Sequence, residues 1–269
     1  MKIAVFYHHI REAAKQAGLT EEQVLVQLRK AGVGYAEADF DDLVKNPEMI
    51  VRLNEAGLSV SSIYCFFDFA LRKEEDRVWQ LIKTAHQARC RQVMVIPGFY
   101  YSEEKEARRE ALDRMVHMTG AFCQLASANG LTVTMEDFDD SRSPIKNSRG
   151  LLYFAERIPE LKITFDTGNF VFCGEDVLEA FERLKDKIVH VHCKDRRIEG
   201  FDAEEGKMDE RGHIMYASPV GSGFLPMEEI VRRLQAMGYD GIYTAEHFGS
   251  MKQLEYMFES VAWLKAHEI

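Results

Sequence analysis

Four side chains of types that bind metal ions or transfer protons each lie near the end of a short apolar run. They are Glu136 in LTVTMEDF, Asp166 in LKITFDTGN, His192 in KIVHVHCKD and Glu246 in GIYTAEH. Each run has the composition of a strand. Because side chains alternate between the two faces of a strand, residues two positions apart share a face. The pattern therefore predicts four strands whose polar faces end in a carboxylate or an imidazole directed toward one point.

The neighbours of these four residues support this interpretation. The residues two positions earlier are also polar, and the positions between them are mainly apolar. The polar set is Thr134, Thr164, His190 and Thr244. Successive candidates are separated by 30, 26 and 54 residues, and one strand–helix–strand unit takes about 30 residues. We therefore expect consecutive parallel strands, the last preceded by an insertion, that deliver the four side chains at their carboxyl ends, where the active sites of barrels lie.

Three carboxylates and one imidazole make a chemically specific set of donors. Any one buried acid is more often part of a structural ion pair, but four at matching strand ends favour a metal site. Hard oxygens with one borderline nitrogen suit first-row divalent ions and Mg²⁺. We expect one divalent metal ion, manganese first, with magnesium, cobalt and zinc as alternatives.

Strand and helix patterns alternate along the whole chain, which predicts a parallel sheet. Predicted strands cover 2–7, 33–40, 58–66 and 91–98, followed by the four strands above. Predicted helices cover 20–32, 47–56, 73–88, 103–128, 149–158, 175–185, 226–237 and 251–266. Eight repeats favour an α/β fold of one domain, a (β/α)8 TIM barrel over residues 1–269. An open doubly wound sheet is the alternative, but it usually carries a glycine-rich loop after its first strand, and HHIREAAK has no glycine.

Residues 193–225 interrupt this alternation. The segment is charged at first and then apolar and glycine-rich in YASPVGSG. Long loops in compact domains are usually functional, and this one follows His192 directly. We expect it to cover the active face or to contact another subunit.

Composition restricts the partners and the compartment. The net charge of −10 disfavours nucleic acid. Five scattered cysteines without a C-x-x-C pair favour a reducing compartment. No apolar run approaches the ~20 residues that span a bilayer, and the N-terminus has too short an apolar stretch for a signal peptide. We expect a cytoplasmic protein without a membrane or nucleic-acid partner, and a homo-oligomer stays open.

Several motifs give the chain a family resemblance. They are IPG (96–98), MED (135–137), FDTGNF (165–170), HVHCKD (190–195), GSG (221–223) and GYDGIYTAEH (238–247). With these the chain resembles the xylose isomerase-like barrels, specifically the sugar phosphate isomerase/epimerase group. The resemblance implies that Glu136, Asp166, His192 and Glu246 are metal ligands and that Glu136 and Glu246 are the two acid–base groups.

The resemblance also implies contacts with substrate. Lys194 and Asn169 fall where members often contact it. Many tagatose-epimerase-like members have a histidine in place of Asn169 and an arginine in place of Ile198, and here Arg197 stands one residue away. These positions make Lys194, Asn169 and Arg197 candidate substrate-binding residues.

Each polar candidate at the mouth has a structural alternative. Lys194 could bind an oxyanion or phosphate, or form an ion pair with Asp195 at the rim. Asn169 could bind a hydroxyl, or only shape the D-T-G-N turn. His9, at the end of the first predicted strand, is expected to line the pocket. His247 has the opposite phase to Glu246 and is expected to point toward the helices.

The predicted function is a metal-dependent isomerase or epimerase of a small sugar, ketose or sugar phosphate. One glutamate would take a proton beside a carbonyl, the metal would stabilise the enediolate, and the other glutamate would return a proton. An inosose-dehydratase-like lyase is the main alternative. An endonuclease IV-like nuclease and a non-enzymatic sugar-binding barrel are the others; the acidic charge and the four-ligand set disfavour the nuclease.

Overall fold

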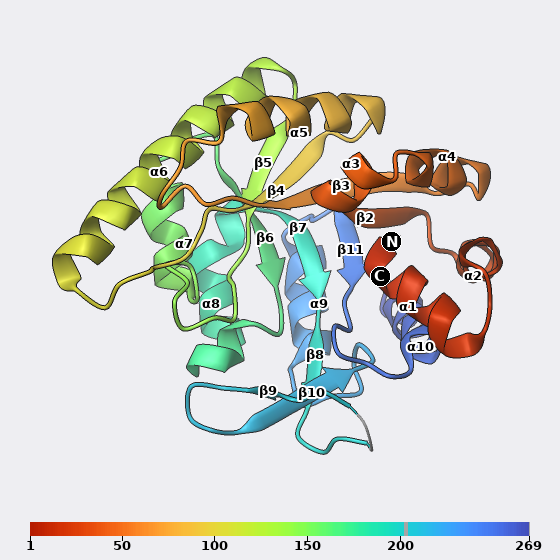
Figure 1. The fold of residues 1–269 in the computed structure, drawn as a ribbon. Helices are drawn as coiled ribbons and strands as arrows, with labels where there is room; N and C mark the ends of the chain where they lie inside the picture. Colours follow the sequence, from red (N-terminus) through yellow and green to blue (C-terminus); the bar gives the residue numbers. More distant parts are fainter. Residues whose placement is uncertain (202–203, 269) are drawn as a thin grey trace.

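In a computed structural model of the chain, which describes residues 1–201 and 204–268, eight parallel strands close into a barrel (Figure 1). Around the barrel the strands follow the order β1-β11-β7-β6-β5-β4-β3-β2. This confirms the predicted (β/α)8 fold. The barrel strands are β1 (Lys2–Phe6), β2 (Tyr35–Asp39), β3 (Ser59–Phe66), β4 (Gln92–Ile96), β5 (Thr132–Met135), β6 (Lys162–Asp166), β7 (Ile188–Cys193) and β11 (Ile242–Ala245).

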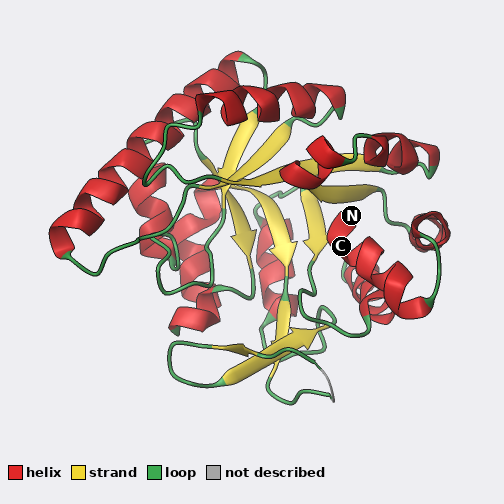
Figure 2. Ribbon diagram, viewed as in Figure 1, coloured by secondary structure: helices red, strands yellow, loops and turns green. Residues whose placement is uncertain are grey.

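Helices surround the strands (Figure 2). The predicted helices are present, with ends within three residues of those expected. They are α2 (Glu21–Ala31), α4 (Glu48–Glu55), α5 (Glu75–Gln87), α6 (Lys105–Ala128), α7 (Ser148–Ala155), α8 (Val177–Leu184), α9 (Met227–Ala236) and α10 (Gln253–Ala266). Short 3₁₀ turns η1 (Phe170–Cys173) and η2 (Lys185–Lys187) precede and follow α8. None of the helices in the described part of the chain is long and apolar enough to cross a membrane.

Two helices were not predicted, α1 (Tyr7–Ala17) and α3 (Phe40–Lys45). The first strand ends at Phe6, earlier than expected, and α1 begins at once. Tyr7, Ile10 and Ala14 are buried at spacings of three and four residues, which is the core-facing pattern of a helix. Gly18 then ends α1 in the left-handed conformation, with φ 65°. His9 therefore lies on a helix and not at a strand end.

The segment after β7 is not one irregular loop. It contains a three-stranded antiparallel sheet of β8 (Asp195–Arg197), β9 (Lys207–Met208) and β10 (Ile214–Ser218), in the order β8-β10-β9. We call these three strands the flap sheet. They lie beyond the carboxyl end of β7 (Figure 1).

Asp195 connects β8, the first strand of the flap sheet, to residues 221–225, which follow β10. Its buried carboxylate accepts hydrogen bonds from the backbone N–H groups of Arg196 (2.8 Å), Gly221 (3.0 Å), Gly223 (2.9 Å) and Leu225 (3.3 Å). Gly223 approaches so closely that a Cβ there would lie 2.2 Å from Asp195 Oδ1. The last acid of the HVHCKD motif and the GSG motif therefore form one structural joint.

Candidate metal centre and cavity

The four predicted ligands converge at the carboxyl ends of four barrel strands. Asp166 ends β6, His192 lies in β7, and Glu136 and Glu246 directly follow β5 and β11. All four are buried, and one ligand atom of each lies within 4.8 Å of those of the others. We call Glu136, Asp166, His192 and Glu246 the ligand ring.

Hydrogen bonds from the D-T-G-N turn hold Asp166 in place. Its Oδ1 accepts from the N–H groups of Gly168 (2.7 Å) and Asn169 (2.8 Å), which leaves Oδ2 for the ring. On β7, His192 Nδ1 lies 2.6 Å from Glu136 Oε2 and 3.3 Å from Glu246 Oε2. The turn and the strand thus direct an oxygen and a nitrogen toward the same point.

The unpaired atoms of the ring fit a cation. Glu136 Oε2, Asp166 Oδ2 and His192 Nδ1 are buried, and none makes a well-formed hydrogen bond among the described residues, although Glu136 Oε2 lies 2.6 Å from His192 Nδ1 and Asp166 Oδ2 lies 3.7 Å from Lys194 Nζ. Buried polar atoms without partners are rare and costly. A divalent ion among them would pair with all three, and Glu246 would supply a further oxygen. This mixture of hard oxygens and one imidazole nitrogen is the type that Mn²⁺, Mg²⁺, Co²⁺ and Zn²⁺ accept.

Burial and neighbouring charges set the pKa values of the two glutamates in opposite directions. Burial raises the pKa of Glu136, against the effect of His192. Burial would also raise that of Glu246, but Lys194 and His192 together hold its pKa well below the ordinary value. The ammonium of Lys194 contacts the Glu246 carboxylate directly and donates to Asn169 Oδ1 at 2.8 Å.

Asp166 and His192, the other two ring members, both have pKa values above their ordinary ones. Burial raises the pKa of Asp166 to about 8. Burial alone would lower the pKa of His192, but the carboxylates of Glu37 and Glu136 raise it well above its ordinary value. Without a cation, the ring therefore retains protons at neutral pH, which a bound ion would displace.

A cavity of about 480 Å³ opens above the ring. Of the predicted residues, Glu136, Glu246, Lys194 and Asn169 line it. Five aromatic side chains also line it, and we call them the aromatic wall: Phe6, Tyr64, Phe66, Phe138 and Phe248. A cavity lined by apolar and aromatic side chains with a few polar groups is typical of a site for a small molecule.

The flap sheet contributes to this cavity. Glu205, Gly206 and Lys207 line it, with Arg196 from β8. Asp139, in the segment after β5, binds both basic side chains: Arg196 Nη2 lies 3.1 Å from its Oδ2 and Lys207 Nζ lies 3.1 Å from its Oδ1. These ion pairs join the segment to Asp139 beside the cavity, and its role as a cover of the active face stays a prediction.

Arg197 does not lie where the sequence predicted. Its guanidinium donates to the Ala217 carbonyl (3.0 Å) and to the Tyr256 hydroxyl (3.2 Å) and pairs with Glu204, all outside the cavity. Side-chain alternation explains the difference, since Arg196 shares a face with Lys194 and Arg197 has the opposite one. This alternation was the signal by which the sequence could have identified Arg196 as a residue that lines the cavity.

His9 is the second correction. It lies on α1, is fully buried and does not line the cavity. Its Nε2 accepts from the backbone N–H of His247 at 2.9 Å, and its ring packs edge-on against Phe248. His9 therefore supports the residues after Glu246. His247 points to α10 as expected, with its Nε2 2.8 Å from Ser260 Oγ.

Two buried acids near the ring were missed. Asp137 follows Glu136, and neither carboxylate oxygen has a partner among the described residues. Burial and the charges of Asp166 and Glu136 raise its pKa well above the ordinary value. Glu37, on β2, contacts His192 from the side opposite the ring. Only its occurrence as an acid inside the apolar strand pattern YAEAD marked it in the sequence.

Comparison with known proteins agrees with this architecture. The sequence model described as xylose isomerase-like TIM barrel matches residues 25–267. An inosose dehydratase of Lacticaseibacillus casei is 33% identical over 90 residues, which are 30% of this chain and 28% of that protein. The chain thus matches less than a third of the length of this curated relative.

Solved structures extend the likeness to the whole fold. A probable 3-DHS dehydratase, AsbF, from Bacillus anthracis superposes with a TM-score of 0.73 at 17% identity, over 98% of this chain and 99% of that one. A D-tagatose 3-epimerase-like protein gives 0.72 at 19% identity, over 99% and 97%. At these identities the likeness establishes a shared fold.

Proposed function

Because the chain belongs to the xylose isomerase-like TIM barrel family, we propose that it is a metal-dependent isomerase or epimerase of a small polyhydroxylated carbonyl compound. The observation that carries the proposal is the position of Glu136 and Glu246. They come from β5 and β11, and β6 and β7 lie between these strands in the barrel. Both line one cavity, so a substrate between them would meet a carboxylate on either side.

The ligand ring would hold the ion through Glu136, Asp166, His192 and Glu246. When bound, a divalent ion polarises a carbonyl and its neighbouring hydroxyl and makes the hydrogen on the carbon between them more acidic. We favour manganese, and a small sugar, ketose or sugar phosphate as substrate.

The two glutamates would then divide the proton transfers between them. One of them would remove the proton and the other would return one, and Glu246 differs from Glu136 in that its carboxylate contacts the ammonium of Lys194. Return to the same carbon inverts its configuration, whereas return to the adjacent carbon moves the carbonyl group. The same residues exchange roles in the reverse reaction.

The remaining cavity residues would orient the substrate. Lys194 is held by Asn169 and Glu246 and can donate a further hydrogen bond to a substrate oxygen. Asn169 fixes that ammonium while its own amide donates to the Asp137 carbonyl at 2.9 Å. The aromatic wall would exclude water from the reacting carbon.

A dehydratase is the second candidate, favoured by the 90-residue likeness to inosose dehydratase. Removal of the same proton would be followed by loss of a hydroxyl group from the next carbon. Lys194 carries a buried ammonium beside Glu246 and could donate the proton with which that hydroxyl leaves as water.

Incubation in D₂O with a panel of ketoses, ketose phosphates and inososes separates these reactions. An isomerase or epimerase incorporates solvent deuterium at carbon and leaves the substrate formula otherwise unchanged. A dehydratase releases water and gives a conjugated product that absorbs in the ultraviolet.

Variants of the two glutamates test their assigned roles. Glu136→Gln and Glu246→Gln should each slow exchange by about 10²–10⁴-fold, as the loss of a positioned base does. Glu175→Gln is the matched control, because Glu175 binds Ser148 and Arg183 and lies outside both the ring and the cavity. Exchange that survives both ring substitutions with the metal still bound would refute the assignment.

A further inference from the structure

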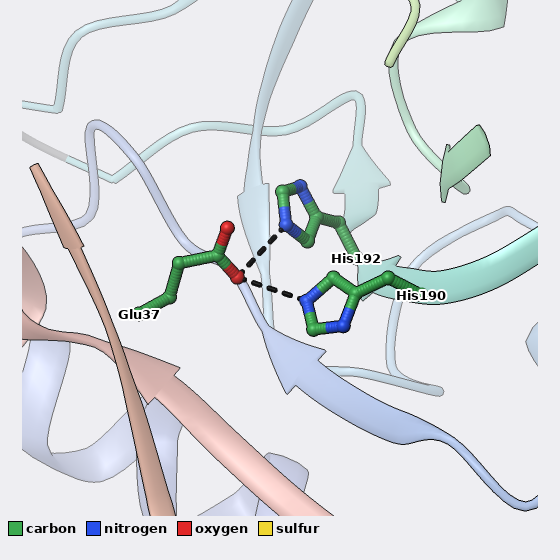
Figure 3. Close-up of side chains that lie close together, drawn as sticks. All are labelled: Glu37, His190 and His192. Carbon is green, nitrogen blue, oxygen red and sulfur yellow. Dashed lines mark hydrogen bonds and ion pairs between the residues drawn. The ribbon is translucent and has the colours of Figure 1, made fainter. Parts of the chain in front are cut away.

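A second polar group lies inside the barrel on the far side of His192. Glu37 on β2 reaches across to His190 and His192 on β7 (Figure 3). One oxygen, Glu37 Oε2, lies 3.0 Å from the Nε2 atoms of both imidazoles. Thr244 Oγ1, from β11, donates to the same oxygen at 3.3 Å. All four residues are buried.

The chemistry of these contacts fixes a proton. An ionised carboxylate only accepts hydrogen bonds, so each Nε2 must carry the hydrogen and donate it. His192 can then act as a metal ligand only through Nδ1. That is the nitrogen that faces the ring, where it lies 2.6 Å from Glu136 Oε2 and 3.3 Å from Glu246 Oε2. The other tautomer would set a lone pair against the Glu37 carboxylate.

The backbone near Glu37 is irregular. The register between β2 and β3 shifts between Ala36 and Glu37, so that Ala36 pairs with Val60 but Glu37 pairs with Ser62. Ser61 is thus an extra residue on β3. Irregularities of this kind redirect side chains and are common beside active sites.

The same three residues, Glu37, His190 and His192, could themselves surround a second ion. The hydrogen bonds argue against that role. The Nε2 atoms of both histidines are already paired with Glu37, whereas the unpaired nitrogen of His192 is Nδ1, on the ring side. The contacts therefore favour one metal position, supported from behind.

We propose that Glu37 is a positioning residue that holds His192 with its Nε2 protonated and its Nδ1 directed into the ligand ring, and that His190 helps to hold the Glu37 carboxylate. The inference rests on the proposed metal-dependent function. Carboxylates that bind the far nitrogen of a ligand histidine fix its tautomer and orientation, and their loss typically weakens metal binding by about 10–100-fold.

Two measurements test this role. Nitrogen-15 NMR of histidine-labelled protein, assigned with a His192→Asn variant, reports which nitrogen carries hydrogen before and after Mg²⁺ or Zn²⁺ is added. Titration calorimetry with Mn²⁺ gives affinity and stoichiometry. In the wild type, Nε2 of His192 should be protonated in both states, and Nδ1 should carry no proton once the ion is bound.

The variants form a graded series. Glu37→Met removes the acceptor at similar volume and should abolish the protected Nε2–H and weaken Mn²⁺ binding by about 100-fold, at the upper end for such residues. Glu37→Gln keeps a neutral acceptor and should restore much of both. Glu175→Gln is the matched control, since Glu175 is a largely buried acid that binds Ser148 and Arg183, which are not members of the ring.

The outcomes distinguish the positioning role of Glu37 from the proposed metal-dependent function. A wild-type His192 that is unprotonated at Nε2, or a Glu37→Met variant with unchanged affinity, would overturn the role of Glu37. Two bound ions per wild-type chain, one of them lost in Glu37→Gln, would replace it with a second metal site. No ion bound to the wild type would overturn the proposed function, while the NMR result would still decide the contact between Glu37 and His192.

Discussion

The substitution Asp195→Asn should destabilise the flap sheet locally, while the ligand ring should still bind a divalent ion. The carboxylate uses both of its oxygens: Oδ1 accepts from Arg196 and Leu225, and Oδ2 accepts from Gly221 and Gly223. An asparagine keeps one oxygen and places an amide N–H₂ group where the other was. Two backbone N–H groups therefore lose their acceptor and face another donor.

The size of the effect follows from these contacts. Hydrogen bonds to a charged group contribute about 1.5–3 kcal/mol each, so two of them give a loss of about 3–6 kcal/mol. This loss falls on the joint between β8 and residues 221–225 and not on the ring. The flap sheet should therefore open locally before the barrel unfolds.

Hydrogen–deuterium exchange measured by mass spectrometry is the direct assay. Backbone N–H groups of residues 214–225 should exchange at least about 100-fold faster in Asp195→Asn, which corresponds to about 2.8 kcal/mol of lost protection at 1.4 kcal/mol per factor of ten. Exchange in the barrel strands should change little, and Mn²⁺ should still bind.

Asp176→Asn is the matched control. At the start of α8, Oδ1 of Asp176 accepts both N–H groups, from Leu178 and Glu179, so an asparagine can retain both bonds. An Asp195→Asn protein whose flap sheet is as protected as that of Asp176→Asn would refute the reasoning.

Three further predictions concern the ring and its surroundings. In Gly168→Ala the new Cβ would lie 2.7 Å from Lys194 Cγ. Crowding of this kind typically costs about 1–3 kcal/mol. Thermal unfolding should therefore show lost stability, and incorporation of solvent deuterium into substrate should be slower. Gly34→Ala, where a Cβ meets nothing within 4 Å, should show neither effect. In the metal-free protein burial raises the pKa of Asp166 from 3.8 to about 8, so the native state holds the extra proton, and the stability that this group contributes should be lost as pH rises toward 8. Urea unfolding from pH 5 to 9 checks this, and an identical pH profile in Asp166→Asn would contradict it. Lys207→Gln removes the exposed flap contact to Asp139 and should raise KM several-fold with little change in kcat, whereas Lys252→Gln, an exposed lysine near Glu255, should leave steady-state kinetics unchanged.

The barrel and the ring could be predicted because strand alternation carries both. Thr164 and Asp166, or His190 and His192, share a face whatever the surroundings, and about 30 residues per unit set the strand order. The sequence pattern does not predict the helix α1, because it assigns residues 2–7 to a strand and places His8 and His9 at the strand's end. The pair Ala13 and Ala14, followed by Gly18, was the helical signal.

Other parts of the site depend on contacts between distant segments. Glu37 lies 155 residues before His192, and no local pattern could pair them. Asp139 binds Lys207 across 68 residues of sequence, which no local pattern predicts. The family resemblance pointed to Arg197, which does not line the cavity, whereas Arg196 does because the alternation of β7 continues into β8.

The central claim is that Glu136, Asp166, His192 and Glu246 hold one divalent ion. Crystals of the protein soaked with Mn²⁺, with diffraction data collected at the manganese absorption edge, test this most directly. We expect one anomalous peak per chain, within bonding distance of all four side chains and of His192 at its Nδ1, and no peak in crystals of Asp166→Asn. A structure in saturating Mn²⁺ in which His192 Nδ1 still contacts Glu136 and no anomalous density lies among the four residues would contradict the metal site.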